Sequence, residues 1–274
     1  MSTNVPSKII GIWCSMLSPE EIEKNSVLEI TNRETYNNNK PVTGGLFDSR
    51  MGVSESGNVC PTDGYTYINT PGYFGHIKLA RPVLFIQHLK EITKILKCVC
   101  FKCSKLLINK GQYTYLLDLP SDKRWTEVCK LASLDKRCGQ FTEDGCGCKQ
   151  PSKYNVVEMA TIYAEWKDMG EDKQKVTVHM TPEMILKIFK RISDEDIHFM
   201  GFSPKFSRPD WMICQILPVP PPAVRPSVKH DAQQRSEDDL THIYSNIFRT
   251  NKDLKDKIES NASANVIDGL HKLL

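Results

Sequence analysis

Five cysteines gathered between residues 100 and 148 constrain the fold of this chain more than any other feature of its sequence. Cys100 and Cys103 form a C-x-x-C pair, and Cys138, Cys146 and Cys148 follow downstream. Two thiolates from each of two tight turns can close a tetrahedral zinc site, and glycines beside Cys146 allow the second turn. The gap from Cys103 to Cys138 exceeds the roughly 15–20 residues usual in zinc ribbons. The set therefore predicts a structural zinc site that ties two distant segments together.

Two other interpretations of these cysteines stay open from the residues alone. They can be buried free thiols, because cysteine often behaves as a small apolar core residue. The C-x-x-C pair can also be a thioredoxin-like redox motif, although no strand-to-helix context surrounds it. Four further cysteines have no partner at ligand spacing, and we expect them to be core residues: Cys14, Cys98, Cys129 and Cys214.

The overall composition is that of a globular protein, and the N-terminal sequence predicts a reducing compartment. Of the 274 residues, 40% are hydrophobic, 25% are charged and 10 are cysteine. No apolar run approaches the roughly 20 residues that span a membrane, and the N-terminus does not resemble a secretion signal. We therefore expect an intracellular protein that is not secreted and has no membrane partner. A formal net charge of +3 excludes a histone-like, charge-only nucleic-acid binder but not a local basic surface.

The apolar pattern predicts an α+β fold with helices, short strands and long loops. Residues 52–75 are rich in glycine, proline, threonine and tyrosine and are predicted to form an irregular loop. Residues 100–150 show little periodicity. Caps and spacing predict helices starting at Pro19, over 83–98, over 181–190 and from 239 onward, a short helical turn at 194–196, and strands within 155–180 around a polar turn at 167–175.

No catalytic motif is present. The chain has no P-loop, no G-x-S-x-G and no H-E-x-x-H sequence. Acidic runs occur at 194–196 and 237–239, and paired carboxylates can hold magnesium. Runs next to helix ends are more often solvated caps, because negative charge suits a helix N-terminus. We therefore assign them no catalytic role.

Seven motifs, in order along the chain, resemble one protein family. They are LSPEEI at 17–22, GGLFDSRMG at 44–52, FGHIKLARPV at 74–83, CVCFKC at 98–103, GFSPKFSRPDWM at 201–212, LPVPPPAVRPS at 217–227 and EDDLT at 237–241. Over essentially its whole length the chain resembles the N-terminal clamp region of the largest subunit of multisubunit DNA-directed RNA polymerases, nearest to the polymerase II type.

This resemblance implies a mixed α+β clamp core, stapled by zinc, over residues 1–215. Its zinc-binding region is expected at about 98–150. Residues 216–239 then resemble the lid, a proline-rich loop that helps to separate the transcript from the template strand. Residues 240–274 would begin a helical segment that continues beyond the end of the chain.

In the lid-like segment, four residues are the expected nucleic-acid contacts. Pro221 and Pro222 belong to a string of prolines that excludes a helix and is already stiff before it meets a target. Arg225 and Lys229 lie beside this string and are expected to meet phosphates. The alternative for the segment is a P-x-x-P ligand for a partner domain.

The resemblance also implies two zinc sites, and this sequence keeps one of them. The second site is expected at Cys100, Cys103, Cys138 and Cys146, with Cys148 an extra thiol or a substitute for Cys146. We therefore expect one Zn²⁺ per chain.

The first zinc site departs from the family pattern. Where the family has C-x-x-C and then a cysteine and a histidine, this sequence has Cys60, Asp63, Thr70 and Tyr73. We predict that this site holds no zinc. Aromatic packing is expected to replace the metal, through four side chains: Tyr65, Tyr67, Tyr73 and Phe74.

The resemblance implies nucleotidyl transfer from ribonucleoside triphosphates by a whole enzyme that uses two Mg²⁺ ions. The family's magnesium-binding Asp-rich motif is not in these residues, so Mg²⁺ would be bound outside this chain. The expected partners are the DNA template, the RNA transcript, and the second-largest and smaller polymerase subunits. The rival functions are a stand-alone zinc-containing nucleic-acid-binding module and a proline-rich interaction scaffold.

Loss of a zinc site that is typical of cellular enzymes fits a divergent lineage, such as a large DNA virus. The expected location is therefore the nucleus, or a cytoplasmic viral factory or virion.

Overall fold

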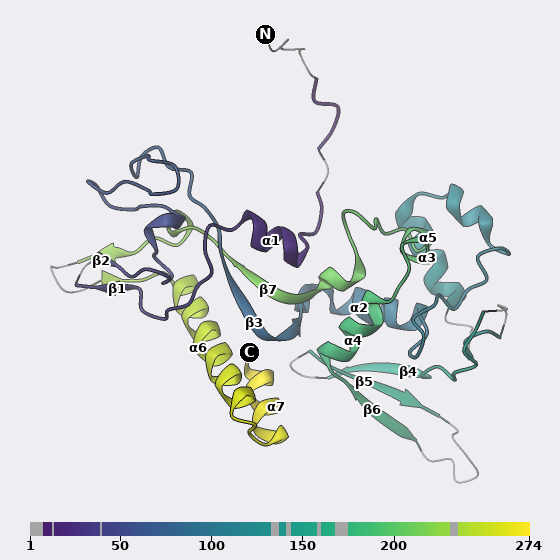
Figure 1. The fold of residues 1–274 in the computed structure, drawn as a ribbon. Coiled ribbons are helices and arrows are strands. Elements are labelled where there is room, and N and C mark those ends of the chain that lie inside the picture. The colour runs from purple at the N-terminus through teal and green to yellow at the C-terminus, as the bar shows by residue number, and fades with distance from the viewer. Residues whose placement is uncertain are drawn as a thin grey trace.

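The computed structural model describes residues 8–12, 14–38, 40–132, 137–140, 144–157, 160–167, 175–230 and 235–274 (Figure 1). The helices are α1 (Pro19–Asn25), α2 (Leu89–Cys98), α3 (Ser121–Ala132), α4 (Pro182–Lys190), α5 (Asp194–Phe199), α6 (Asp239–Glu259) and α7 (Ala264–Leu273). The strands are β1 (Tyr36–Asn37), β2 (Lys40–Pro41), β3 (Gly75–Leu84), β4 (Lys153–Val157), β5 (Thr161–Trp166), β6 (Val176–Met180), β7 (Ile213–Val219), β8 (Val228–Lys229) and β9 (Arg235–Ser236).

All the strand pairs are antiparallel, and the described sheets are small. A three-stranded sheet has the order β4-β5-β6, and the pairs β1-β2, β3-β7 and β8-β9 form two-stranded ribbons. Helices and short antiparallel strands together confirm the predicted α+β class. None of the helices in the described residues is long and apolar enough to cross a membrane.

The β3-β7 ribbon connects two separate hydrophobic cores, and Figure 1 shows it passing from the lobe with β1 and β2 to the lobe with α2–α5 and β4–β6. At one end of the ribbon, Ile77 and Val219 belong to a core that also holds Phe47 and Phe248. At the other end, Leu84 and Ile213 belong to the larger core under α2, α4 and the three-stranded sheet. Each core buries the apolar face of its own elements, and that burial is the main stabilising contribution.

Between the two cores the ribbon loses its regular pairing. Lys78 pairs with Ile216 and Val83 pairs with Cys214, so four residues of β3 face one residue of β7. The buried side chain of Asn251, from α6, takes the place of the missing strand partner. Its Nδ2 donates to the Lys78 carbonyl at 2.8 Å, and its Oδ1 accepts from the Ala80 amide at 2.7 Å. Asn251 thereby satisfies backbone groups that the ribbon leaves unpaired.

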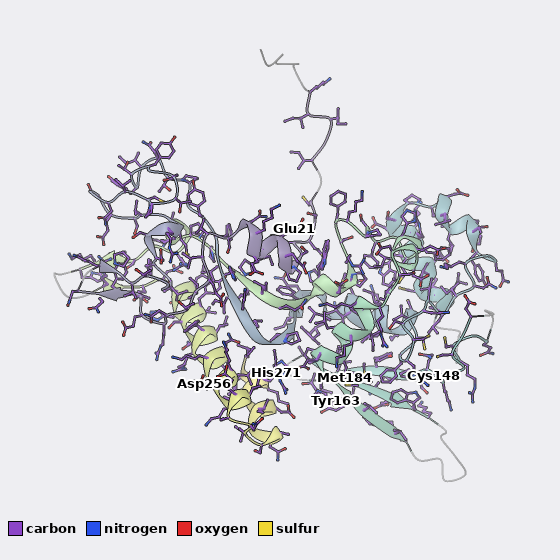
Figure 2. All side chains as sticks on the ribbon, in the orientation of Figure 1. Glu21, Cys148, Tyr163, Met184, Asp256 and His271 are labelled. Carbon is purple, nitrogen blue, oxygen red and sulfur yellow. The ribbon has the colours of Figure 1, made fainter. Side chains whose placement is uncertain are left out.

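The C-terminal helix α7 reaches the same irregular stretch. His271, which Figure 2 labels beside the ribbon, donates from Nε2 to the Pro82 carbonyl at 2.9 Å. Arg81 lies 3.5 Å from both Asp268 of α7 and Glu183 of α4. Side chains from three helices therefore hold the unpaired part of β3.

Several expected elements are confirmed by the structure. Helix α1 begins at Pro19 with a capping box, in which Ser18 and Glu21 exchange bonds of 2.9 and 3.0 Å. Helix α4 follows the Thr181 cap, the tail from Asp239 is helical, and β4, β5 and β6 fall in or beside the predicted strand region. Most of the expected polar turn at 167–175 lies outside the described residues.

One prediction of secondary structure is wrong, and one helix was not predicted. The expected helix over 83–98 begins only at Leu89, because Val83 and Leu84 pair with β7. Helix α3 occupies a region where the sequence shows little periodicity, and only part of it is buried. Its short apolar face packs against α2 and against the loop before α3. Because these are tertiary contacts, the local sequence pattern does not reveal the helix.

Candidate metal centre and lid-like segment

The first half of the metal centre is a tight turn directly after α2. The Cys100 amide donates to the Lys105 carbonyl at 2.8 Å, and the Ser104 amide donates to the Cys100 carbonyl at 2.9 Å. Ser104 takes a left-handed conformation with φ of 64°, which lets the chain reverse. Both Cys100 and Cys103 therefore point into the same side of the turn.

The second half is a loop rich in glycine. The Cys138 amide donates to the Cys148 carbonyl at 3.0 Å, and the Gly147 amide returns a 3.0 Å bond to the Cys138 carbonyl. Gly139 and Gly145 cross so closely that a Cβ on Gly145 would lie 1.9 Å from the Cα of Gly139. Only glycine fits such a crossing, so these residues allow the two arms of the loop to meet.

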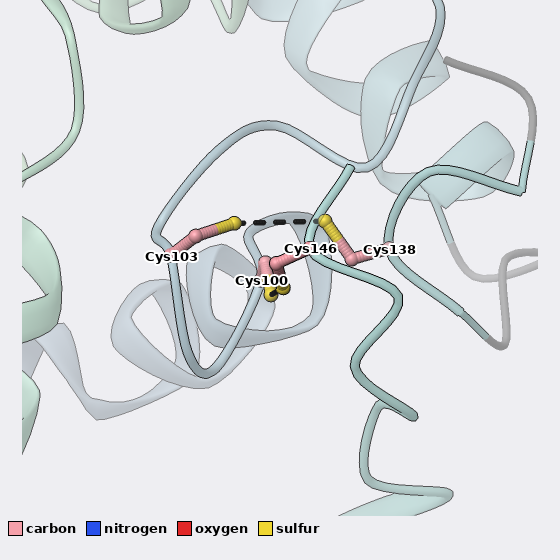
Figure 3. A group of neighbouring side chains, drawn as sticks. All are labelled: Cys100, Cys103, Cys138 and Cys146. Carbon is pink, nitrogen blue, oxygen red and sulfur yellow. Dashed lines mark hydrogen bonds between the residues drawn. The ribbon is translucent and has the colours of Figure 1, made fainter. Parts of the chain in front are cut away.

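The two halves place four sulfur atoms around one point (Figure 3). The Sγ atoms of Cys100, Cys103, Cys138 and Cys146 all lie within 4.8 Å of one another. Cys100 is 3.5 Å from Cys146, and Cys103 is 3.6 Å from Cys138. A tetrahedron with Zn–S bonds of about 2.3 Å has S···S edges of about 3.8 Å, whereas a disulfide needs about 2.05 Å. The donor set and its spacing therefore fit a tetrahedral zinc ion.

Cys148 lies beside this cluster and not in it. Its Sγ is 3.6 Å from the Lys149 carbonyl, while its own carbonyl accepts from Cys138. Figure 2 labels Cys148 in the lobe that carries the three-stranded sheet. In the part of the chain that the structure describes, the four clustered cysteines are the only group of three or more metal-ligating side chains that converge.

The sulfur atoms also have hydrogen-bond donors around them. The buried Gln150 donates from Nε2 to Cys100 Sγ at 3.2 Å and accepts from the Phe101 amide at 2.9 Å. The Lys102 amide is 3.4 Å from the same sulfur. Such donors stabilise thiolate ligands and fix their orientation. Sequence reasoning missed Gln150, and no local signal marks it.

The thiols differ in their acidity. Burial raises the pKa of Cys103 and of Cys138 above the usual value for cysteine. Burial also acts to raise the pKa of Cys146, but the Cys148 amide and the neighbouring thiols offset it and hold that pKa at about 7. A metal ion must therefore displace protons from Cys103 and Cys138, which makes its binding dependent on pH.

The residues that stand at the first zinc site also converge, but on a carboxylate. Asp63 Oδ2 accepts from the Thr70 hydroxyl at 2.7 Å and from the Tyr73 hydroxyl at 3.1 Å. Asp63 Oδ1 accepts from the Tyr65 amide at 2.9 Å, and Cys60 is fully buried. One thiol and one carboxylate, with two hydroxyls already donating, do not form a zinc site. The residues present therefore do not fit the metal.

The predicted aromatic replacement for that site is wrong. Tyr65, Tyr67 and Phe74 have exposed fractions of 55%, 45% and 51%. Only Tyr73 turns inward, and it does so through its hydroxyl bond to Asp63. Hydrogen bonds to a carboxylate, rather than stacked rings, hold this loop together.

The proline-rich segment is packed into the protein at its middle. Pro218 belongs to β7, where it pairs with His76 at the edge of a two-stranded ribbon. Pro221 and Pro222 are buried, and a Cβ on Gly72 would lie 2.7 Å from Cβ of Pro221. The expectation that these two prolines meet nucleic acid is not supported by their position, because neither presents a free surface.

Arg225 is completely buried, which contradicts its expected contact with phosphate. Its guanidinium donates to the Pro220 carbonyl at 3.0 Å, to the Thr241 hydroxyl at 3.3 Å and to the Leu46 carbonyl, and it lies 4.9 Å from the Phe47 ring centroid. Burial lowers the pKa of Arg225 to about 10, so the group stays charged at neutral pH. Its role is to join the base of the lid-like segment to the smaller core.

Beyond Arg225 the chain forms the β8-β9 hairpin. Lys229 is exposed on β8, and Val228 beside it is 56% exposed. Arg235 on β9 lies 3.9 Å from the Tyr36 ring centroid and forms an ion pair with Glu55. Residues 231–234, part of the predicted 216–239 lid, lie outside the described residues.

The acidic runs have structural partners. Asp194 and Asp210 pair with Arg208, and Asp196 lies 2.8 Å from Lys110. Asp238 caps α6 by accepting from the Leu240 amide at 2.9 Å. The second run is therefore a helix cap as expected, whereas in the first run Ser193 caps α5 and Asp196 is buried.

Comparisons with known proteins agree with these observations. The model of the family described as RNA polymerase Rpb1, domain 1, matches residues 6–274. The chain is also similar to DNA-directed RNA polymerase subunit Rpo1N of Methanocaldococcus jannaschii, with 38% identity over 284 residues. That alignment covers 98% of this chain and 20% of the relative, so the chain spans about one fifth of that relative's length.

Proposed function

Because the chain belongs to the family of RNA polymerase Rpb1 domain 1, we propose that it acts as the N-terminal clamp and lid portion of a DNA-directed RNA polymerase largest subunit. The match from residue 6 to residue 274 carries this proposal. The whole enzyme would transfer nucleotides from ribonucleoside triphosphates onto RNA, and this portion would hold the DNA template and the transcript. The second-largest and smaller subunits would be its partners, in the nucleus or in a viral factory.

A zinc ion held by Cys100, Cys103, Cys138 and Cys146 would serve as a structural cross-link. The convergence of the four sulfur atoms supports this assignment. The ion would tie the turn after α2 to the loop before β4, and those segments otherwise share few apolar contacts: Cys100, Leu107 and Cys138 form their small buried cluster. A structural zinc site contributes directly to folding free energy. The four cysteines would therefore have a structural role and not a catalytic one.

The β8-β9 hairpin is the part of the lid-like segment that we assign to nucleic acid. Lys229 is exposed there and is the remaining candidate for a phosphate contact, since Arg225 is buried. The buried base formed by Pro221, Pro222 and Arg225 would keep the hairpin at a constant angle to the body. A wedge between strands needs such a rigid base.

Purification of the chain through an affinity tag, from the cells that produce it, tests the proposal. We expect the other polymerase polypeptides in the purified complex, together with RNA synthesis that depends on a DNA template and Mg²⁺. The matched variant is Cys100→Ser, which should reduce assembly, with Cys214→Ser, a buried thiol outside the cluster, as control. A monomer with salt-dependent DNA binding and no polymerase activity would instead favour a stand-alone nucleic-acid-binding module.

A further inference from the structure

Two cysteines outside the metal centre also meet in the structure. Cys98 is the last residue of α2, and Cys129 lies near the end of α3. Their Sγ atoms are 3.9 Å apart, and the Cys98 thiol donates toward Cys129. The thiols of Cys60, Cys148 and Cys214 lie instead against backbone carbonyls. Cys98 and Cys129 therefore form a dithiol pair, which the fold creates from residues far apart in the sequence.

The geometry of this pair suits a disulfide bond. A disulfide requires the two sulfur atoms to be about 2.05 Å apart, so the pair must close by roughly 1.9 Å. Rotation of a cysteine side chain between neighbouring rotamers moves its sulfur by about 3 Å and leaves the backbone in place. Both residues lie on helices that pack against each other in the larger core. The bond can therefore form without unfolding of either helix.

The two thiols differ in their access to solvent. Cys98 is completely buried, whereas Cys129 is only partly buried against the same core. A small oxidant can therefore reach Cys129 before Cys98. The hydrogen bond from Cys98 lowers the pKa of Cys129, and the nearby charge of Lys94 acts in the same direction, while burial opposes both. Cys129 is thus the nucleophile of the pair, and Cys98 is the thiol that resolves the intermediate.

We propose that Cys98 and Cys129 form a reversible disulfide, with a low-molecular-weight disulfide such as oxidised glutathione as the oxidant. Cys129 attacks one sulfur atom of the oxidant and releases one small thiol, which leaves a mixed disulfide on the protein. Cys98 then attacks the Cys129 sulfur and displaces the second small thiol. Two protein thiols become one disulfide, and the two electrons and two protons that they lose convert the small disulfide into two thiols.

The disulfide would cross-link the same two segments as the metal centre. Cys98 lies two residues before Cys100, and Cys129 lies nine residues before Cys138. Zinc would join these segments at the four clustered cysteines, and the disulfide would join them at the helices that precede both halves. The disulfide would therefore retain the packing of α3 on α2 when the metal is absent. This inference is independent of the proposed function.

Oxidation of the full chain, purified with zinc, by an excess of oxidised glutathione tests the proposal. Free thiols are then alkylated, and the protein is digested with trypsin without reduction. We expect the peptide at 98–102 to be linked to the peptide at 125–130, by a bond that fragmentation assigns to Cys98 rather than to Cys100. The exposed Cys14 should carry glutathione, which shows that the oxidant was active. Zinc content should stay unchanged, and a thiol reductant should separate the two peptides.

Single substitutions distinguish the roles of the two thiols. In Cys98→Ser the reaction should stop at the mixed disulfide, so Cys129 should carry one glutathione. In Cys129→Ser the buried Cys98 should stay unmodified. The matched control is Cys214→Ser, a buried thiol that faces a carbonyl, and it should give the linked peptides in full yield.

Hydrogen exchange tests the consequence of the cross-link. The oxidant is removed, and zinc is then withdrawn with a chelator from both the oxidised and the reduced protein. Exchange at the α3 amides should be about tenfold slower in the oxidised protein, because the bond restricts the separation of α3 from α2. Equal exchange in the two forms would refute the cross-linking role.

Three further results would overturn the inference: glutathione retained on Cys129 in the unsubstituted protein, a disulfide that contains one of the four clustered cysteines in place of Cys98, or alkylation of both Cys98 and Cys129 in protein whose Cys14 carries glutathione. These results leave the proposed function intact, because that function is tested by the polymerase polypeptides that co-purify with the chain.

Discussion

Replacing Arg225 by alanine should destabilise the protein by about 4–8 kcal/mol without removing a nucleic-acid contact. The guanidinium makes three hydrogen bonds and stacks on Phe47. Hydrogen bonds to a charged group contribute roughly 1.5–3 kcal/mol each, and a buried cation–π contact adds about 2 kcal/mol. Burying the guanidinium charge costs free energy and offsets part of this stabilisation. The fall in pKa from 12.5 to about 10 corresponds to roughly 3 kcal/mol.

The alanine variant loses these contacts and leaves carbonyl groups of Leu46 and Pro220 buried without their donor. Each unpaired group costs about 1–3 kcal/mol, so the loss outweighs relief from burying a charge. The expected loss is a large fraction of the 5–15 kcal/mol that stabilises a typical protein. Denaturant unfolding of the zinc-loaded chain measures it.

Lys229→Ala is the matched control, because Lys229 is exposed on the same segment. It should change stability by less than about 0.5 kcal/mol and should weaken binding to DNA, with a smaller salt dependence. If Arg225→Ala unfolds at the same denaturant concentration as the parent but binds DNA more weakly than Lys229→Ala, then Arg225 is a phosphate contact and our reasoning is refuted.

Three further predictions follow from the sites. Elemental analysis should find one zinc ion per chain. The Cys146→Ser variant should lose this ion, and the Cys148→Ser variant should keep it. Two zinc ions per chain, or equal loss of zinc in both variants, would contradict the assigned ligands. Chelation of zinc should leave hydrogen exchange at the Tyr65 amide unchanged, whereas Asp63→Asn should accelerate it, because an amide cannot accept all three bonds; the reverse pattern would indicate a metal in this loop. Burial lowers the pKa of His76 below its usual 6.5, so the folded state binds this proton more weakly than the unfolded state. Stability should therefore fall as the pH drops from about 6.5 toward the folded pKa, and His76→Gln should show a shallower fall in unfolding free energy over that range; an identical slope would disprove the effect.

Local features of the fold could be predicted because they depend on neighbouring residues. The capping box at Ser18 and the cap at Thr181 act within one helical turn, so their sequence signals were sufficient. The prediction over 83–98 was wrong because its apolar spacing also suits a strand that pairs with β7. The apolar periodicity of helix α3 is weak, because its burial depends on α2 and on the loop before α3.

The candidate metal centre was partly predictable for the same reason. The C-x-x-C turn is a local motif, and the sequence named all four cysteines whose sulfur atoms converge at this centre, but not Gln150, which donates to one of them. It left the choice between Cys146 and Cys148 open, because both lie on one glycine-rich stretch. The crossing of Gly139 and Gly145 decides which sulfur faces Cys100.

By itself, the sequence determined the membership of a family and the residue types available as ligands. The tertiary structure alone decided what those residues do. Asp63 became the centre of a hydrogen-bonded loop, and Arg225 became a buried anchor, because their partners are brought together only by folding. Burial and charge pairing depend on residues far apart in the sequence, as in the bond from Arg225 to Leu46, which spans 179 positions, and no local pattern encodes such contacts.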